Sequence, residues 1–313
     1  MKICMLGCGA LGSTIGGQLA AAGLDVYFLD KWEAHISAMV NRGLKIIEPP
    51  SERLVKVRAK TSCSEIEPVD LVIILVKSFH TREAIENALP IIGDKAMVLS
   101  LQNGLGNEEI LIDVLGKKRV ISGKTYVGGV LIGPGEVLAG VKGKLTYIGE
   151  LDGKITERIK QVNDLFNQAG LQTIVSDNIY GIIWYKLLIN VATGALAAIT
   201  RLTYGVLTTM ENIIEIATEA VAEAVTVAKA DGVELPVKDP REIWNKATEG
   251  LPYEFKTSML QDIEKGSRTE IDYINGSVVR LGEKYNIPTP VNKTLVTCIK
   301  GIEFQQKMLK KDN

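Results

Sequence analysis

Two polar residues interrupt an apolar stretch in the second half of the chain. Lys186 and Asn190 are four residues apart in IWYKLLIN, so they share one face of a helix. Their neighbours are apolar nearly all round, which predicts a buried helix whose lysine and asparagine need partners. A lysine held at the edge of a cleft can donate a proton to a forming alkoxide. The alternative is a lysine that extends from the helix border into solvent.

A glycine-rich motif opens the chain. It has the form G-x-G-x-x-G and consists of Gly7, Cys8, Gly9, Ala10, Leu11 and Gly12. The first glycine allows a tight turn, the second lets the backbone approach a pyrophosphate, and the third lets a helix pack close to a strand. Because the motif lies between a predicted strand and a predicted helix, it predicts dinucleotide binding at the helix N-terminus. The alternative is a glycine-rich packing turn.

An acidic residue ends the next predicted strand. Asp30 lies where an acid usually accepts hydrogen bonds from the ribose hydroxyls of NAD, and it would repel a 2′-phosphate. Lys31 follows and offers a positive charge to that phosphate. The sequence therefore favours NADH and leaves NADPH open, with a simple turn residue as the alternative for Asp30.

Two further polar residues follow predicted strands. Lys77 comes after 70–76 and Asn103 after 96–101, and ligands of open α/β sheets gather outside the carboxyl ends of strands. We expect both in that crevice. The alternatives are a solvated loop lysine and an ordinary Asn-Gly turn. Ser258 and Glu270 indicate no chemistry when taken alone.

The first half of the chain alternates between strand and helix patterns. The strands are continuous apolar runs, which are typical of a parallel sheet covered on both faces. Strands are predicted at 2–7, 25–30, 70–76, 96–101 and 119–121, and helices at 11–22, 80–89 and 107–115. Beyond about residue 123, glycines and short β-rich pieces predict antiparallel strands or hairpins, before a helix at 154–169 and a strand at 171–175. The pattern predicts an α/β doubly wound sheet of the Rossmann type.

The β signal disappears from Ser176 onward. Prolines separate helix-like stretches at 178–199, 211–230, 240–249, 254–265 and 269–285. We therefore predict a dinucleotide-binding domain at 1–175 and an all-α substrate and catalytic domain at 176–313, with a frayed KKDN end.

Composition excludes several classes of function. Lys and Arg total 36 and Asp and Glu 37, which gives no basic footprint for nucleic acid or membrane. With four cysteines, none in a C-x-x-C pair, and two histidines, a metal site is not expected. Reduced thiols indicate a cytoplasmic protein, and we expect neither a secretory signal nor a membrane span. The sequence leaves a homodimer open.

Five segments together resemble the ketopantoate reductase family. They are the glycine motif, VKSF at 76–79, QNGLGNEE at 102–109, WYKLLIN at 184–190 and the long block SMLQDIEKGSRTEIDYINGSVVRLGEKYNIPTPVN at 258–292. The resemblance spans almost the whole chain, and the last block is far more specific than the glycine motif. It implies a Rossmann domain, a helical domain and a site in the cleft between them, where NAD(P)H reduces 2-dehydropantoate to pantoate on the route to pantothenate and coenzyme A.

The resemblance also assigns roles to residues. It implies that Lys186 is the catalytic acid and that Asn103 contacts cofactor and substrate. Lys77 would be a further residue of the crevice, and Asn190 and Ser258 would bind substrate. Glu270 would shape the site, reach the cofactor and help keep Lys186 protonated.

Three positions depart from the family pattern. Many members carry a second asparagine where this chain has Gly194, and often an asparagine in the segment that here reads Phe255-Lys256-Thr257. Asp30 stands in place of the arginine-type pattern of NADP-using members. A D-2-hydroxyacid dehydrogenase acting on branched or aromatic 2-keto acids is therefore the alternative. A non-catalytic NAD(P)-binding sensor is a more remote one, because it would need none of the four residues Lys186, Asn190, Ser258 and Glu270.

Overall fold

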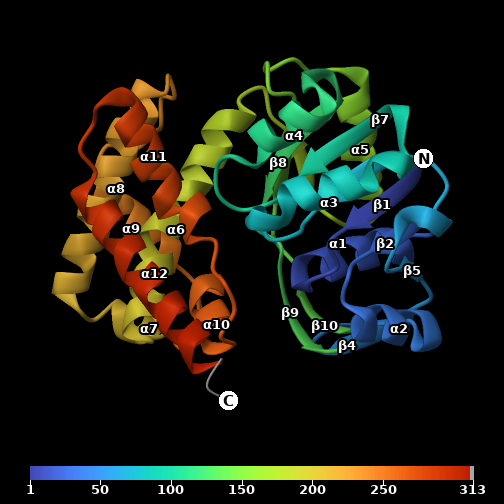
Figure 1. Ribbon diagram of the computed structural model, residues 1–313, viewed down its shortest axis with the longest axis horizontal. Helices are drawn as coiled ribbons and strands as arrows, with labels where there is room; N and C mark the ends of the chain where they lie inside the picture. The colour runs from blue at the N-terminus through green and yellow to red at the C-terminus, as the bar shows by residue number, and fades with distance from the viewer. Residues whose placement is uncertain (311–313) are drawn as a thin grey trace. The chain divides into compact units, whose positions relative to one another are not determined.

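The computed structural model describes residues 1–310 of the chain (Figure 1). The chain folds into two compact units, Met1–Gln102 with Asn107–Ile179 and Asn103–Gly106 with Tyr180 onward. The first is an α/β unit and the second is helical, which confirms the predicted fold class. The boundary after residue 175 stays a prediction, and the expected fraying of the KKDN end falls mainly on 311–313, outside the described residues.

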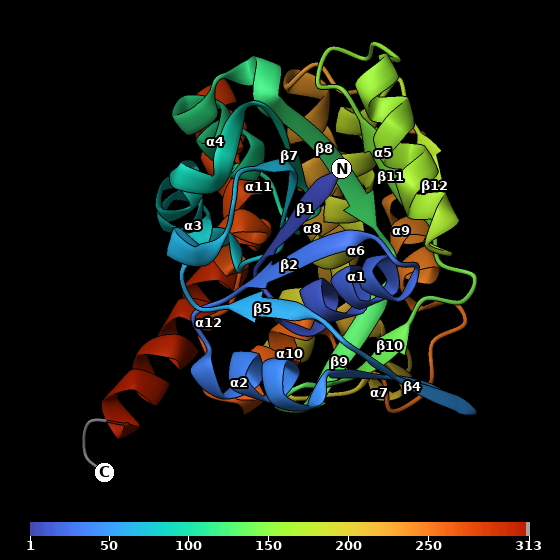
Figure 2. The ribbon, with the colours of Figure 1, turned by 90° about the vertical axis from the view of Figure 1, so that its right-hand side faces the viewer.

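Six neighbouring strands of the large sheet, from one edge inward, run parallel to one another (Figure 2). In spatial order they are β5 (Arg58–Lys60), β2 (Asp25–Leu29), β1 (Lys2–Leu6), β6 (Val69–Ile74), β7 (Ile92–Ser100) and β8 (Val120–Thr125). This is the order of a doubly wound dinucleotide-binding sheet, with its switch point beside β1. Beyond β8 the sheet continues with β11 (Thr146–Gly149), which is antiparallel to β8, and β12 (Thr173–Val175).

Alternating side chains of the strands fill two cores, one on each face of the sheet. From β1, Ile3 and Met5 enter the core that contains Ile15 of α1 (Ala10–Ala21). Cys4 and Leu6 enter the opposite core, which is covered by α3 (Thr81–Ala88) and α4 (Asn107–Leu115). Because both faces are covered, the strands can be apolar throughout, as the sequence predicts.

A second sheet of four strands packs against α1. Its order is β4 (Ser51–Val55), β3 (Leu44–Glu48), β10 (Glu136–Gly140) and β9 (Gly128–Gly133). The antiparallel pairing expected beyond residue 123 is present in β9 and β10, but this hairpin joins β3 in a separate sheet. The sequence did not predict β3 to β5 or α2 (Glu33–Arg42). The remaining helix of this unit is α5 (Glu157–Gln168).

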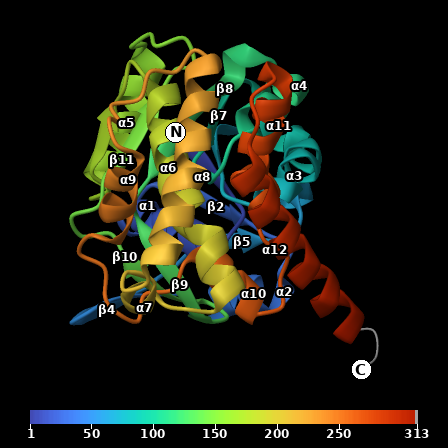
Figure 3. The ribbon, with the colours of Figure 1, turned by 90° about the vertical axis from the view of Figure 1, so that its left-hand side faces the viewer.

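The described residues of the second unit contain helices and no strand. The helices are α6 (Ile179–Thr200), α7 (Tyr204–Leu207), α8 (Glu211–Ala230), α9 (Pro240–Thr248), α10 (Ser258–Glu264), α11 (Asn275–Tyr285) and α12 (Pro290–Leu309). Figure 3 shows α8 at the centre, where it packs against α9, α11 and α12. Of the described helices, α6 alone is long and apolar enough to cross a membrane. Since 67% of its apolar window is buried inside the protein, α6 is the core helix of this unit.

Two helix predictions need correction, and one helix was not predicted. The helix expected at 254–265 begins only at Ser258, because the Thr257 hydroxyl caps it by accepting a hydrogen bond from the Leu260 amide. The helix expected at 269–285 is broken at Ile274, whose ψ of −100° is not helical; a 3₁₀ turn (Ile271–Tyr273) precedes α11. The sequence did not predict α12, the last helix.

Candidate functional site

The glycine motif forms the loop that joins β1 to α1. Gly7 has φ +98°, and a Cβ there would lie 2.5 Å from the Val76 amide nitrogen. A Cβ on Gly12 would lie 1.9 Å from the Gly7 carbonyl oxygen. Both positions therefore exclude any side chain, as expected of the first and third glycines of a dinucleotide loop.

The middle glycine faces open space. A Cβ on Gly9 would meet nothing within 4 Å, and no side chain caps the helix that begins at the next residue. The first turn of α1 contains no acidic residue. Because the first amides and the dipole of a helix favour an anion, this loop fits a pyrophosphate.

Asp30 holds the loop from the neighbouring strand. Its Oδ2 accepts a hydrogen bond from the Cys8 amide at 2.6 Å, and its Oδ1 accepts one from the Trp32 amide at 2.9 Å. An ionised carboxylate has about four acceptor sites, so acceptors remain for ribose hydroxyls. Lys31 forms a surface ion pair with Glu83 at 2.5 Å. Exposed ion pairs contribute little to stability, so this one would not prevent Lys31 from meeting a phosphate.

A buried histidine supports the same loop from behind. Nδ1 of His35 accepts a hydrogen bond from the Gly135 amide at 3.0 Å, so the neutral ring carries its proton on Nε2, which lies 3.0 Å from the Ser13 hydroxyl. Ser13 in turn donates to the Cys8 carbonyl at 2.8 Å. Burial lowers the pKa of His35, which favours this neutral form. Sequence reasoning missed His35 and Ser13, since neither stands out by spacing or type.

Lys77 and Asn103 follow the carboxyl ends of β6 and β7, as predicted, and both are half-buried. The segment of Asn103 belongs to the helical unit. There the Leu105 amide donates to the Tyr273 carbonyl at 2.9 Å, and the Tyr273 amide donates to the Glu270 carbonyl at 3.0 Å. The structure thus brings the segment that carries Asn103 against the turn that carries Glu270.

Lys186 and Asn190 lie on α6 at half-buried positions, and Lys186 is the only charged residue of this helix. Trp184, Leu187 and Leu188 beside them are fully buried. The predicted apolar helix that carries Lys186 and Asn190 is therefore present. Glu270 is buried, and its pairing with Lys186 stays a prediction.

The next position along the same face of α6 is Gly194, four residues after Asn190. A Cβ there would lie 3.6 Å from the terminal methyl group of Met259, which is an ordinary van der Waals distance. Ser258, the residue before Met259, is exposed at the start of α10. Packing between Met259 and Gly194 thus brings the N-terminal end of α10, with Ser258, against α6. The thioether of Met259 therefore lies beside Gly194.

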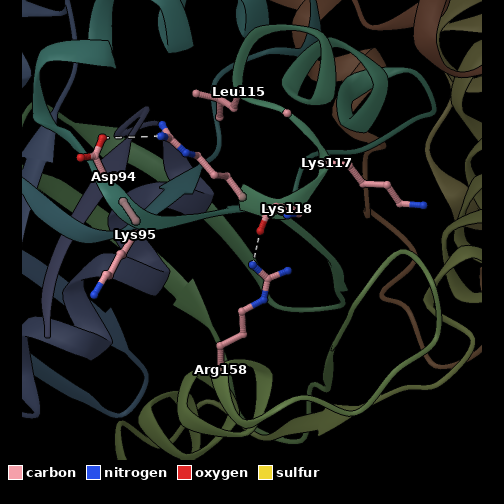
Figure 4. A pocket seen from close by; sticks show the side chains of 9 residues that line it. Asp94, Lys95, Leu115, Lys117, Lys118 and Arg158 are labelled. Carbon is pink, nitrogen blue, oxygen red and sulfur yellow. Dashed lines mark hydrogen bonds and ion pairs between the residues drawn. The ribbon is translucent and has the colours of Figure 1, made fainter.

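A basic pocket of about 400 Å³ lies in the first unit, away from the residues above (Figure 4). Its lining includes Arg119 and Arg158, whose guanidinium groups already have partners. Arg158 donates to Glu150 and to the Lys118 carbonyl, and Arg119 lies 3.8 Å from Asp94. None of the sequence-predicted site residues lines this pocket. Among the described residues, no group of three or more His, Cys, Asp or Glu side chains could hold a metal ion.

Comparison with known proteins is consistent with this geometry. Residues 3–153 match the family description "Ketopantoate reductase PanE/ApbA", and 178–303 match "Ketopantoate reductase PanE/ApbA C terminal". A 2-dehydropantoate 2-reductase of Pyrococcus horikoshii is 38% identical over 97% of this chain and 98% of that protein. One of Archaeoglobus fulgidus is 32% identical over 96% and 98%.

Solved structures give the same result. A PanE/ApbA family ketopantoate reductase from Ralstonia eutropha JMP134 has a TM-score of 0.90 and 35% identity, covering 98% of this chain and all of that one. D-mandelate dehydrogenase in a ternary structure with NADH and anilino(oxo)acetate has a TM-score of 0.92 and 27% identity, with the same coverage. This chain belongs to the ketopantoate reductase PanE/ApbA family.

Proposed function

We propose that this protein is an NAD(P)H-dependent 2-dehydropantoate 2-reductase, which reduces ketopantoate to pantoate in pantothenate and coenzyme A biosynthesis. The observation that carries the proposal is the similarity to enzymes of that name over 97% of the chain, together with the predicted site residues at suitable positions of the fold. The four cysteines form no disulfide, which supports a cytoplasmic location.

The residues divide the chemistry between them. The glycine loop would hold the pyrophosphate of the dinucleotide, whose nicotinamide would supply a hydride to the keto carbon when bound. Lys186 donates a proton to the keto oxygen, and its charge stabilises the negative charge that develops there. Asn190 and Ser258 hold the carboxylate and hydroxyl groups of the substrate. The resemblance to the family implies that Asn103 contacts cofactor and substrate and that Lys77 lies in the crevice. It also implies that Glu270 shapes the site and reaches the cofactor.

We further propose that NADH is the preferred cofactor. Asp30 places a carboxylate at the loop that would receive the adenosine ribose, and the Lys31 ammonium already pairs with Glu83. A 2′-phosphate would therefore meet a negative charge, with only a surface lysine to offset it.

One observation favours a second candidate, a D-2-hydroxyacid dehydrogenase for branched or aromatic 2-keto acids. Gly194 and Met259 present an apolar surface where an amide would recognise the hydroxyl group of ketopantoate. D-mandelate dehydrogenase has the same fold at 27% identity. A site without the polar partner of a substrate hydroxyl discriminates poorly in favour of that substrate.

The deciding experiment measures oxidation of NADH and NADPH with ketopantoate, 2-ketoisovalerate, 2-ketoisocaproate and benzoylformate. Wild type is compared with Lys186→Ala, for which we expect a loss of about 10²-fold or more in kcat, the usual size of a general acid's contribution. A tenfold preference for another keto acid would replace the first candidate by the second. NADH binding without turnover of any keto acid would instead indicate a sensor.

A further inference from the structure

A buried ion pair lies close to the carboxyl edge of the large sheet. Lys124, near the end of β8, has a side chain that is only 2% exposed, and its Nζ lies 3.9 Å from Glu108 Oε1 on α4. Glu108 is itself 8% exposed and accepts a hydrogen bond from the Ser122 hydroxyl at 2.6 Å. Burying an ammonium group is costly, so its direct contacts deserve a functional explanation.

The ammonium group of Lys124 donates a hydrogen bond to a backbone acceptor, the carbonyl oxygen of Gln102. That oxygen belongs to the peptide group that joins Gln102 to Asn103. A charge-assisted hydrogen bond is about twice as strong as a neutral one and fixes the plane of the peptide it binds. It also polarises the peptide, which makes the Asn103 amide a stronger donor.

The side chain of Gln102 makes two further hydrogen bonds. Its Nε2 donates to the Val76 carbonyl at 2.9 Å and to the Thr81 hydroxyl at 2.8 Å. The Val76 carbonyl belongs to the peptide group that joins Val76 to Lys77. One buried amine and one buried amide therefore hold the two peptide groups from which Asn103 and Lys77 extend.

We propose that Lys124 is a positioning residue for the reaction, which acts through Gln102 to orient Asn103 and Lys77. Lys124 does not transfer the proton itself, because its ammonium group is enclosed and directed at a backbone carbonyl. The inference rests on the proposed function only in assigning roles to Asn103 and Lys77. A purely structural ion pair would contribute stability and nothing more.

Two variants separate positioning from stability. Lys124→Met leaves Glu108 buried without its cation, so it should lower both Tm and kcat. Lys124→Met combined with Glu108→Gln removes both charges, so most of the lost Tm should return, but the bond to the Gln102 carbonyl stays absent. For this double variant we expect kcat still about tenfold below wild type, and a higher KM for NADH. Recovery of kcat together with Tm would overturn the proposal.

The matched control is the double variant Arg158→Met with Glu150→Gln, which neutralises another ion pair of the same unit. Glu150 is 7% exposed and Arg158 donates to it at 2.6 Å, but neither contacts Gln102. We expect a lower Tm with kcat and KM unchanged. An equal fall in kcat in this control would attribute the kinetic loss to lowered stability and overturn the proposal.

A further variant tests the positioning role without removing a buried charge. A binding assay separates failure of this inference from failure of the proposed function. Gln102→Met keeps both charges and removes the hydrogen bond to the Val76 carbonyl, so kcat should fall about tenfold here too, and an unchanged kcat would contradict the proposal.

NADH affinity, measured by fluorescence without substrate, should weaken several-fold in the Lys124→Met, Glu108→Gln variant. If wild type reduces no 2-keto acid, the proposed function fails, whereas unchanged NADH affinity in that variant would overturn the positioning role alone.

Discussion

One face of α6 carries a lysine, an amide and then a glycine at successive turns. Lys186 and Asn190 are half-buried, and Gly194 lies against Met259. A lysine on an otherwise apolar helix keeps a charge close to buried surface, where electrostatic stabilisation of an oxyanion is strongest. The glycine leaves the next position without a polar group. Under the proposed function, the residue at position 194 therefore influences which keto acid the enzyme prefers.

Replacing Gly194 tests that preference. In Gly194→Asn the new amide can bond to the hydroxyl group of ketopantoate, so we expect kcat/KM for ketopantoate to rise about 5- to 10-fold relative to 2-ketoisovalerate, as for a hydrogen bond worth about 1 kcal/mol. The measurement is a competition between the two keto acids.

Gly194→Ala is the matched control for this substitution. Its Cβ fits at 3.6 Å from Met259 and should stabilise the helix by about 1 kcal/mol without changing the preference. An equal change of preference in both variants would show that packing against Met259, and not the amide, selects the substrate.

At the scale of elements, the glycine loop depends on α2 and the second sheet as much as on β1 and α1. His35 of α2 joins the Gly135 amide, in the turn between β9 and β10, to Ser13 of α1. Both nitrogens of the ring are used, one as acceptor and one as donor. Protonation would turn the Nδ1 acceptor into a donor that faces the Gly135 amide.

This arrangement predicts a pH dependence of stability. Burial lowers the pKa of His35 below its unfolded value of about 6.5, so the unfolded chain takes up a proton first. The contribution of His35 to the free energy of unfolding should therefore be constant above about pH 6.5. It should decrease as pH drops from there towards the folded pKa. His35→Leu should have a lower Tm at pH 8, because it leaves the Gly135 amide unpaired at a cost of about 1–3 kcal/mol, but a smaller fall in Tm between pH 8 and 5.5.

The only other histidine of the chain supplies the control. His80 is exposed, and His80→Gln should keep the wild-type dependence of Tm on pH. If His80→Gln flattens the curve and His35→Leu does not, His35 is not the group that titrates.

The contact between the Asn103 segment and the Glu270 turn leads to a prediction for adding a single methyl group at Gly104. Gly104 has φ +80°, and a Cβ there would lie 2.5 Å from the Tyr273 carbonyl oxygen. Gly104→Ala must move the loop, so we expect both a lower Tm and a fall of about tenfold in kcat. The strain of an alanine at positive φ alone costs of order 1 kcal/mol.

Gly116 isolates the backbone-strain part of that effect. It has the same φ of +80°, and a Cβ there would meet nothing within 4 Å. Gly116→Ala should thus lower Tm through backbone strain and leave kcat unchanged. Similar kinetics in the two alanine variants would mean that the Tyr273 contact does not hold Asn103 in place.

The elements that the sequence predicts are those with long, regular patterns. The parts of β1, β6 and β7 that lie between the two cores are largely apolar because both faces of the sheet are covered, and the glycine motif is specific because two of its glycines have no room for a Cβ. Of the strands that escaped prediction, β5 has only three residues, and much of β4 is exposed. The pairing of β3 with β10 joins segments far apart in the chain, which no local pattern records.

Some residues of the candidate site could be predicted from local sequence patterns, and others could not. Residues that follow strands or interrupt apolar helices stand out in the sequence, and Lys77, Asn103, Lys186 and Asn190 are of this kind. Lys124 and His35 do not stand out, because their importance comes from burial and from partners that only the folded chain provides. The exposed end of α10 beside Met259 likewise becomes visible only when α10 and α6 pack together.

At the scale of the whole molecule, every residue proposed to hold the adenosine and pyrophosphate part of the cofactor lies in the first unit. Binding to the folded state alone stabilises it by about 2.7 kcal/mol at a ligand concentration 100 times Kd. For a unit of this size, that corresponds to a rise in Tm of roughly 5–10 °C. We expect saturating NADH to produce this shift in calorimetry, and NADPH at the same concentration to produce a smaller one.

Asp30→Asn decides whether the carboxylate is the cause of this difference. The variant keeps the size of the side chain and an oxygen that can accept a hydrogen bond from the Cys8 amide, but it removes the charge that we propose bonds to ribose hydroxyls and repels a 2′-phosphate. The shift with NADH should shrink and the shift with NADPH should grow, so that the two nucleotides become nearly equal. If wild type already binds both equally, or if Asp30→Asn changes neither shift, the cofactor preference must come from residues other than Asp30.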